Sequence, residues 1–288
     1  MNMQNKRWKK LTLPYDVNID DAVRQQHHAA QFIALVGRHL IPRKPDDSNT
    51  NMDFIAELNA LVGNPMAGGL RVGLQLTDMV LLIVDENFRR LHAMTLTGKT
   101  KNEVLTKLKA ELRQQGAKVD GLNRKLHYEL PEHLLDKGAA FSISDRIFFE
   151  EMTAHRYNAQ LVLDQLVQPY EHAAPVKVWP HHFDTGTIIP VDYDEKGEIA
   201  QSMGLGWAIP DRMVAEPYYY LNFWSSEPVK YFDHLPPLKQ GEWITSGWQG
   251  GILKLSDMLT YTSAEEQHGA VRLFFESGIN ILQHHLNV

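Results

Sequence analysis

The stretch Leu70–Leu96, LRVGLQLTDMVLLIVDENFRRLHAMTL, sets the fold class. Its first seven residues alternate leucine or valine with polar residues or glycine, which is the pattern of a strand with one buried face. Turn-forming residues follow at Thr77-Asp78 and again at Asp85-Glu86-Asn87. The stretch therefore predicts a three-stranded antiparallel meander, with strands at 70–76, 79–84 and 88–96.

Helix patterns lie on both sides of this meander. Thr100 and Glu103 have the spacing of a capping box, and Gly116 suits the end of the helix that they begin. Asp20 can cap an earlier amphipathic helix, which Pro42 prevents from continuing. Together with apolar faces elsewhere, these signals predict helices at 20–40, 52–62, 101–116, 147–168 and 263–286.

Short strand patterns dominate the second half of the chain, where clusters of Gly, Pro and Asp separate them. Asp192–Gly197 is similar to the start of a calcium loop, but Lys196 occupies a ligand position, so a polar hairpin loop is predicted there. Further strands are expected at 125–130, 176–178, 185–191, 203–208 and 218–223.

The expected fold class is therefore α+β. An antiparallel sheet, either as two sheets or as one strongly curved sheet, is expected to pack with about four to five helices. No linker-like segment and no repeat of fixed period divides the sequence. We expect one domain over residues 1–288, with intertwined halves at 1–145 and 146–288 as the alternative.

Composition and charge argue against several classes of protein. Hydrophobic residues make up 43% of the 288 residues, which is enough for a sizeable core. The net charge is −6 and the Lys and Arg residues are scattered, so no nucleic-acid partner is expected. The chain has no cysteine, which excludes disulfides and thiolate ligands. Because no apolar run approaches the length of a membrane span, we expect a cytoplasmic protein without a membrane partner.

Val178–Gly186, VWPHHFDTG, is the candidate catalytic segment. If this segment is extended, His182 and Asp184 project from one face and His181 projects from the other. A His-x-Asp pair completed by a distant histidine is a ligand set for Fe(II) or zinc, so a divalent metal cofactor is one expectation. The candidates for the third ligand are His234, His268 and His285.

Two interpretations without a metal stay open. Asp184 can orient His182 so that the other ring nitrogen acts as a general base. Alternatively, Asp184 accepts backbone N–H groups at a bend, and both residues are structural. His155 lies on an apolar helix stripe and is expected to be a core histidine, not a ligand.

Aromatic residues can enclose such a site. Alternation places Tyr218 and Tyr220 on one face of a strand, where their hydroxyl groups suit a polar ligand. The predicted site combines His182 and Asp184, as catalytic or metal-binding residues, with the ligand-binding residues His181, Trp179, Trp207, Glu216, Tyr218 and Tyr220. The leading expectation is a protein that binds a small molecule in this pocket. The alternatives are a metal-dependent enzyme and a non-catalytic interaction or scaffold protein, and the oligomeric state stays open.

The chain resembles a family of uncharacterised bacterial proteins of unknown function in five segments, Tyr157–Ala159, Pro175–Asp184, Gly204–Trp207, Glu216–Tyr220 and Gly241–Trp243. The resemblance rests on a Trp-Pro-His-His-Phe-Asp strand and a Glu-Pro-Tyr-x-Tyr strand, and it extends from about Trp8 to about His285. Because family members need not carry both histidines, the resemblance implies a structural role for the Phe-Asp pair. It implies a coherent fold and no particular activity.

Overall fold

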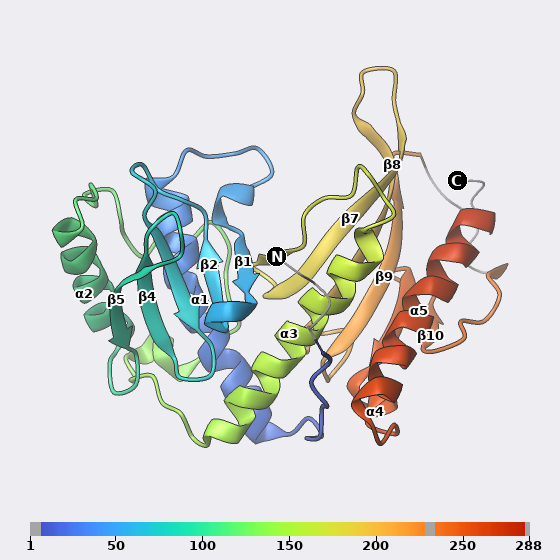
Figure 1. Ribbon diagram of the computed structural model, residues 1–288, viewed down its shortest axis with the longest axis horizontal. Helices are drawn as coiled ribbons and strands as arrows, with labels where there is room; N and C mark the ends of the chain where they lie inside the picture. Colours follow the sequence, from blue (N-terminus) through green and yellow to red (C-terminus); the bar gives the residue numbers. More distant parts are fainter. Residues whose placement is uncertain (1–6, 228–233, 286–288) are drawn as a thin grey trace. The chain divides into compact units, whose positions relative to one another are not determined.

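The computed structural model describes residues 7–227 and 234–285 (Figure 1). Within these residues the chain forms five α-helices and eleven strands, so the predicted α+β class with an antiparallel sheet is confirmed. Hydrogen bonds link the strands in the order β10-β11-β9-β8-β7-β6-β1-β2-β3-β4-β5, which is one sheet and not two. None of the helices in these two ranges is long and apolar enough to cross a membrane.

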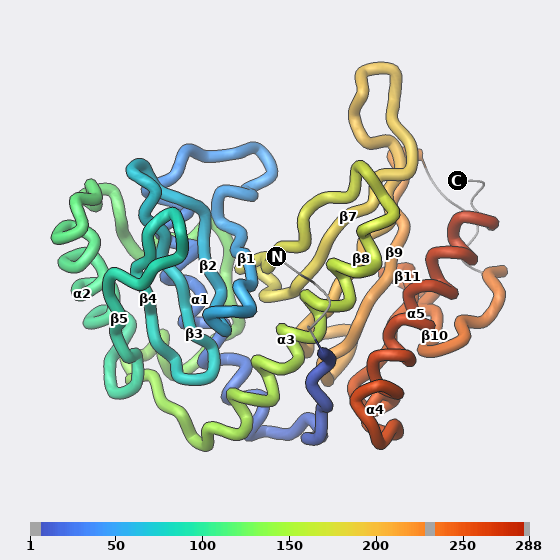
Figure 2. The backbone as a smooth tube through the Cα atoms, in the orientation of Figure 1, coloured from blue at the N-terminus to red at the C-terminus, as the bar shows by residue number. Residues whose placement is uncertain are grey.

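The chain divides into two compact units whose segments alternate along the sequence. Unit 1 consists of Met1–Tyr15, Ala154–Val176 and Asp184–Val288. Unit 2 consists of Asp16–Thr153 and Lys177–Phe183. The backbone trace in Figure 2 follows these segments by colour, from blue at the N-terminus to red at the C-terminus.

Unit 2 is built on the predicted meander. Strands β3, β4 and β5 pair antiparallel, with Arg71 opposite Val84 and Leu81 opposite Met94. Helix α1 packs against β2 and β3, and Gly63 permits this because a Cβ there would overlap the side chain of Ile33. The elements of unit 2 are α1 (Val17–Leu40), η2 (Ser48–Thr50), β1 (Met52–Ile55), η3 (Ala56–Leu58), β2 (Ala60–Gly63), β3 (Arg71–Gln75), β4 (Val80–Val84), β5 (Arg90–Thr95), α2 (Lys101–Gln114), η4 (Leu134–Lys137) and β6 (Lys177–Trp179).

Two predictions in unit 2 are wrong. The helix expected at 52–62 is instead the hairpin of β1 and β2, in which Met52 pairs with Gly63 and Asn59 adopts a left-handed conformation, φ 49°. The apolar spacing there suits either structure, and pairing of β2 with β3 favours the strand. The strand expected at 125–130 has no regular structure. Side chains hold that segment, since Tyr128 Oη donates to Gln31 Oε1 at 2.7 Å.

The predicted N-cap is correct for α2 and wrong for α1. The capping box of Thr100 and Glu103 is formed, and α2 begins directly after it. Helix α1 begins earlier than expected because Asp16, and not Asp20, is its N-cap and accepts from the Asn18 and Ile19 amides.

Unit 1 contains strands β7 to β11 of the sheet, with helices on one face. Strands β7, β8 and β9 form a meander in which Trp207 lies opposite Tyr219. Both side chains are on the helix-covered face, where the Tyr219 ring contacts Phe275 of α5 edge-on. Helix α3 (Arg146–Val167) is divided between the units. Its residues up to Thr153 belong to unit 2, and those from Ala154 onward belong to unit 1. The other elements of unit 1 are β7 (Asp184–Tyr193), β8 (Ile199–Ala208), β9 (Tyr218–Ser225), β10 (Glu242–Ile244), β11 (Gly250–Lys254), α4 (Leu255–Met258) and α5 (Ala264–His285).

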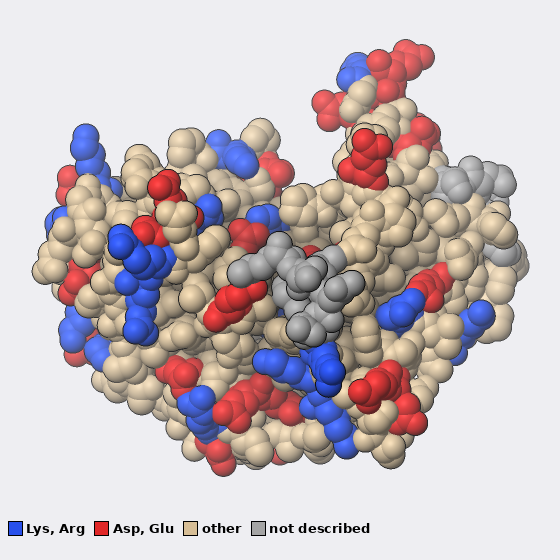
Figure 3. Space-filling model, viewed as in Figure 1, with Lys and Arg blue, Asp and Glu red and all other residues tan. Residues whose placement is uncertain are grey.

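The predicted hairpin loop at Asp192–Gly197 is confirmed at the end of β7 and β8. Asp194 closes the turn, because its Oδ1 accepts from the amides of Lys196 and Glu198. Acidic side chains gather at this end of the hairpin (Figure 3).

The N-terminal segment of unit 1 is held by side chains of α3 and α5. The amide of Lys9 donates to Asn158 Oδ1 at 2.8 Å. Gln267 of α5 uses both ends of its side-chain amide, accepting from the Leu11 amide at 2.9 Å and donating to the Leu11 carbonyl at 2.9 Å. The Gln267 side chain thereby pairs with both backbone groups of a residue 256 positions away, as a neighbouring strand would.

Candidate functional site

The segment Val178–Gly186 is not one extended strand. Strand β6 ends at Trp179, and the next four residues form a turn in which the Phe183 amide donates to the Trp179 carbonyl at 2.7 Å. Phe183 has φ 56°, and its buried ring stacks on His27 at 4.9 Å. Burying this ring is the physical reason for the turn, so the expected alternation of side chains fails at 180–183.

His181 and His182 are both exposed in this turn. The ring of His181 lies 4.5 Å from that of His182, 6.3 Å from Trp179 and 5.9 Å from Tyr128. These aromatic residues belong to unit 2, whereas Asp184 begins β7 in unit 1. The structure therefore does not describe His182 and Asp184 as members of one strand face.

The candidate third metal ligands have other surroundings. His268 stacks on Trp8 at 5.1 Å, and its Nε2 lies 3.2 Å from Gln165 Oε1. His234 is exposed, and the side chain of His285 lies outside the described residues. Among residues 7–227 and 234–285, no group of three or more His, Asp or Glu side chains is placed to hold a metal ion.

The predicted residues of unit 1 lie on two different faces of the sheet. Trp207 is 1% exposed on the helix-covered face, whereas Tyr218 and Tyr220 point to the other face. Tyr220 lies across Gly206, where a Cβ would overlap its ring, and its Oη donates to Asp184 Oδ2 at 2.7 Å. The predicted site residues thus form two separate groups: Asp184, Tyr218 and Tyr220 in unit 1, and Trp179, His181 and His182 in the turn of unit 2.

Two neighbouring carboxylates have defined structural partners. Tyr218 Oη donates to Asp211 Oδ2 at 2.7 Å, and burial with this contact raises the pKa of the Tyr218 phenol. Glu216 accepts from the amide and hydroxyl of Ser256 at 2.7 and 2.9 Å. Glu216 therefore caps the first turn of α4 and is not turned toward the tyrosines.

Unit 1 also buries a cation beside a histidine on α3. Arg156 donates to Thr185 Oγ1 at 2.6 Å and lies 4.8 Å above the Trp207 ring. Burial lowers the pKa of Arg156 to about 9, although the charge of Asp184 opposes this. His155 is buried as predicted and stacks on Trp207, and burial with the adjacent charge of Arg156 lowers its pKa to about 3. His155 is therefore a neutral core residue.

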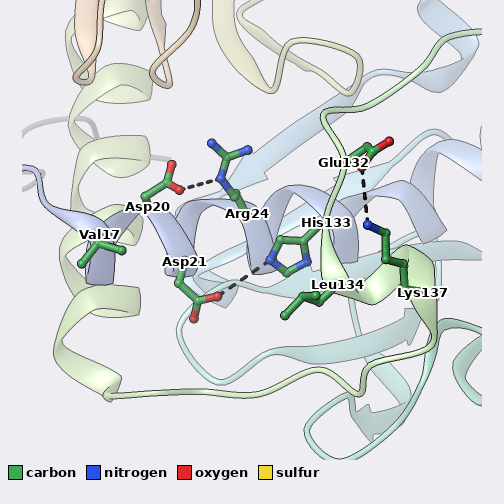
Figure 4. A pocket seen from close by; sticks show the side chains of 8 residues that line it. All are labelled: Val17, Asp20, Asp21, Arg24, Glu132, His133, Leu134 and Lys137. Atoms are coloured by element: carbon green, nitrogen blue, oxygen red, sulfur yellow. Dashed lines mark hydrogen bonds and ion pairs between the residues drawn. The ribbon is translucent and has the colours of Figure 1, made fainter.

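Unit 2 contains a pocket that the sequence did not indicate, with a volume of about 370 Å³ (Figure 4). One wall is the first two turns of α1, and the other is η4 with the residues before it. The residues that line the pocket are Val17, Asp20, Asp21, Arg24, Glu132, His133, Leu134 and Lys137.

Two ion pairs, one on each wall, and one histidine–carboxylate contact between the walls lie at the pocket (Figure 4). Arg24 Nε lies 2.6 Å from Asp20 Oδ2, and Lys137 Nζ lies 3.5 Å from Glu132 Oε2. His133 Nε2 lies 3.9 Å from Asp21 Oδ1. Each pair places a basic group next to an acidic one at the pocket surface.

His133 is fixed in orientation by its own helical turn. As the N-cap of η4 it accepts from the Leu135 amide through Nδ1, at 3.3 Å. A neutral ring then carries its proton on Nε2, the nitrogen on the side of Asp21. Burial lowers the pKa of His133, with the negative charge of Asp21 opposing it, so the neutral ring is the dominant form at neutral pH.

A buried polar network lies behind His133. The ring of His28 stacks on His133 at 5.1 Å. Lys101 Nζ donates to His28 Nδ1 at 2.7 Å and to Asp136 Oδ1 at 2.6 Å. Burial, followed by the charge of Lys101, lowers the pKa of His28 to about 4. Burial also lowers the pKa of Lys101, and Asp136 opposes this shift.

The fold and pocket place this chain in the α+β class, with a charged pocket in unit 2. Comparison with models of known protein families, with curated protein sequences and with solved structures finds no match to the chain. The resemblance to uncharacterised bacterial proteins therefore stays a prediction.

Proposed function

We propose that this protein binds a small charged molecule in the pocket of unit 2. The observation that carries the proposal is the combination of an open pocket of about 370 Å³ with the titratable network behind its wall. Small-molecule sites are generally concave, within roughly 300–1,000 Å³, and use a few well-placed polar groups. Titratable groups with shifted pKa values are enriched at such sites.

The position of Lys101 supports a functional role for the network. Lys101 is the first residue of α2, where the helix dipole disfavours a positive charge, and its side chain is only 12% exposed. A buried ion pair contributes little net stability, because the loss of hydration offsets the attraction. Lys101 contacts His28, whose ring stacks on His133 in the pocket wall. Its effect on the pKa values of these two histidines explains its position better than a contribution to stability does.

The pair of His133 and Asp21 also suits proton transfer. A neutral imidazole can accept or donate a proton near neutral pH, and a carboxylate beside it stabilises the charged form. Whether a reaction follows binding depends on the ligand, so binding is the primary proposal.

A ligand screen tests the proposal. Small charged metabolites are tested for an increase in melting temperature of the wild type and of the double variant Arg24→Gln, Lys137→Gln. We expect some compounds to stabilise the wild type and not the double variant. Arg272→Gln is the matched control, because Arg272 forms an exposed i,i+4 ion pair in α5 of unit 1, as Arg24 does in α1.

The opposite outcomes are equally clear. If no compound stabilises the wild type, or if the double variant responds as the wild type does, the pocket is not a ligand site. An unchanged response of the double variant points to a ligand site elsewhere, whereas the absence of any stabilising compound favours a non-catalytic interaction protein.

A second candidate is the pair of Asp184 and Tyr220 in unit 1. Asp184 Oδ1 is buried and has no hydrogen-bond partner among the described residues, while Oδ2 accepts from Tyr220. A buried carboxylate oxygen without a donor favours a ligand that brings an N–H or O–H group. If this site binds, Asp184→Asn abolishes a stabilisation that the unit 2 double variant retains.

A further inference from the structure

A group of aromatic and imidazole rings lies at the surface of unit 2, outside the pocket. The His181 ring lies within 6.3 Å of the rings of Trp179, Tyr128 and His182, and the His127 ring meets that of Tyr128 edge-on at 4.9 Å. His181 and His182 are exposed, and Trp179 and Tyr128 are half-buried. We call these five residues the ring cluster. Rings that remain accessible in this way can stack on a flat ligand.

A buried glutamine fixes the positions of these rings. Gln31 of α1 is 5% exposed, and its Nε2 donates to the Pro180 carbonyl at 3.0 Å while its Oε1 accepts from Tyr128 Oη at 2.7 Å. His27 Nε2 also lies 2.8 Å from the Pro180 carbonyl oxygen. Phe183, with φ 56°, holds the same turn in a conformation that non-glycine residues rarely adopt. Rings held in this way lose little conformational freedom when a ligand binds.

Two arginines share one carboxylate beside the ring cluster. Asp47 Oδ2 lies 3.1 Å from His127 Nε2, and Asp47 Oδ1 lies 3.7 Å from Arg38 Nη1 and 3.6 Å from Arg43 Nε. The side chain of Arg43 is 66% exposed. One carboxylate balances only one of the two guanidinium charges, so this end of the cluster favours an anion.

The sequence around Asp47 adds to the positive charge. Residues 38–47 and 124–129 together carry five Lys or Arg and three Asp or Glu residues, although the whole chain has a net charge of −6. Burial, followed by the charge of Asp47, raises the pKa of the Tyr128 phenol. Positive charge and accessible rings are therefore neighbours on one surface.

This surface shares no residue with the pocket of unit 2. Arg38 lies near the end of α1, whereas the pocket residue Arg24 lies near its start. At a rise of about 1.5 Å per residue, the two arginines are about 20 Å apart along the helix axis. The inference below therefore does not depend on the function proposed for the pocket.

We infer that this surface binds a small molecule that combines a planar aromatic ring with an anionic group, which is the chemistry of a mononucleotide or of an aromatic carboxylate. The planar ring stacks on His181 and the rings around it. The anionic group pairs with Arg43.

Calorimetry tests the inference with compounds that carry one or both features. EDTA is present throughout, because adjacent histidines can bind trace metal ions. AMP carries both features, adenosine lacks the phosphate, and ribose 5-phosphate lacks the aromatic ring. Indole-3-acetate and indole form the corresponding pair for a carboxylate. We expect AMP or indole-3-acetate to bind about tenfold more tightly than its single-feature analogues. The tighter of the two acids identifies the source of the ligand as a nucleotide or an aromatic acid.

Two variants assign the two features. Arg43→Gln should weaken binding of the tighter acid about tenfold and leave binding of its uncharged analogue unchanged. The double variant His181→Ala, His182→Ala should weaken binding of both compounds about fivefold, because it removes stacking. Arg113→Gln, which breaks another exposed ion pair of unit 2, and His172→Ala, which removes an exposed histidine of unit 1, are the matched controls. Melting curves show whether each variant is folded.

Several results would overturn the inference. It fails if neither AMP nor indole-3-acetate binds, or if both bind no more tightly than their single-feature analogues. It also fails if Arg43→Gln and the double histidine variant bind as the wild type does. Loss of binding in the pocket variant Arg24→Gln, Lys137→Gln, with binding retained in Arg43→Gln, would assign the ligand to the pocket and support the proposed function instead.

Discussion

Each unit buries a cation beside a histidine, with different consequences. In unit 1, Arg156 and His155 lie next to each other on α3, and both contact the Trp207 ring. In unit 2, Lys101 donates to His28, whose ring stacks on the wall of the pocket. The residue types are similar, and the surroundings decide what each pair does.

The difference lies in the partners of the two cations. Arg156 donates to a hydroxyl group and lies over an aromatic ring, and the charge of Asp184 also acts on it. Lys101 contacts an imidazole and a carboxylate, which both titrate. We therefore expect the unit 1 pair to contribute to packing, whereas the unit 2 pair can also respond to a ligand.

The largest expected change in the free energy of unfolding follows from removing Arg156 of the unit 1 pair. Arg156→Ala should lower the free energy of unfolding by about 3–5 kcal/mol, because it removes a buried side chain and leaves Thr185 and Asp184 without its charge. Urea denaturation measures the change. Arg156→Lys keeps the charge without the planar group, so its free energy of unfolding should lie between those of the wild type and Arg156→Ala. A loss below about 1 kcal/mol would contradict a packing role for Arg156.

Acidification compares the two histidines directly. Between their lowered pKa values, about 4 for His28 and about 3 for His155, and the unfolded value of about 6.5, the unfolded chain binds a proton that the folded protein does not. Acidification therefore lowers the free energy of unfolding in this window. Each histidine contributes a loss of about 3 kcal/mol between pH 6.5 and pH 4.

Two variants separate these contributions. His28→Gln keeps an acceptor for Lys101, and His155→Phe keeps an aromatic ring on Trp207. Each should make the stability curve flatter below pH 6.5, as measured by urea denaturation at several pH values. An unchanged curve in either variant shows that its histidine does not control the acid response.

A smaller effect tests the sheet of unit 1. Gly206→Ala should destabilise the protein by about 2 kcal/mol, because the added methyl group displaces the Tyr220 ring and its hydrogen bond to Asp184. Gly269→Ala is the control, since that α5 position is open and alanine favours a helix. Thermal unfolding of both variants should move in opposite directions. Equal shifts would mean that the Tyr220 contact is unimportant.

The smallest effect concerns the unit 2 cation. Lys101→Met should lower stability by only about 1 kcal/mol, because the methionine retains the aliphatic volume and Asp136 is partly exposed. It should also raise the pKa of His28, since the charge of Lys101 contributes to its lowering. NMR titration of His28 measures this shift. A stability loss as large as that of Arg156→Ala would remove the distinction between the units.

Local signals in the sequence were sufficient for much of the fold. The capping box at Thr100 and Glu103 and the alternation at 70–76 each depend on neighbouring residues, and both predictions hold. The segment 52–62 fails because its apolar spacing fits a helix as well as a hairpin, and strand pairing decides between them. Tertiary context outweighs propensity there.

The site was less accessible to sequence reasoning. Lys101 and His28 are separated by 73 positions, and no local pattern connects them. The turn at Pro180–Phe183 depends on burial of one ring against His27, which a period-two pattern does not contain. What could be seen in advance was the pairing of Tyr218 and Tyr220 on one strand face.

The contact between Gln267 and the N-terminal segment has a consequence for synthesis on the ribosome. Every residue of unit 2 has been made once Phe183 is added, so this unit can begin to fold while translation continues. In unit 1, the hydrogen bonds between Leu11 and Gln267 can form only after another 256 residues have been translated. At about 5–20 residues per second, unit 1 remains incomplete for several seconds after unit 2, and during that time its apolar N-terminal residues are accessible to chaperones.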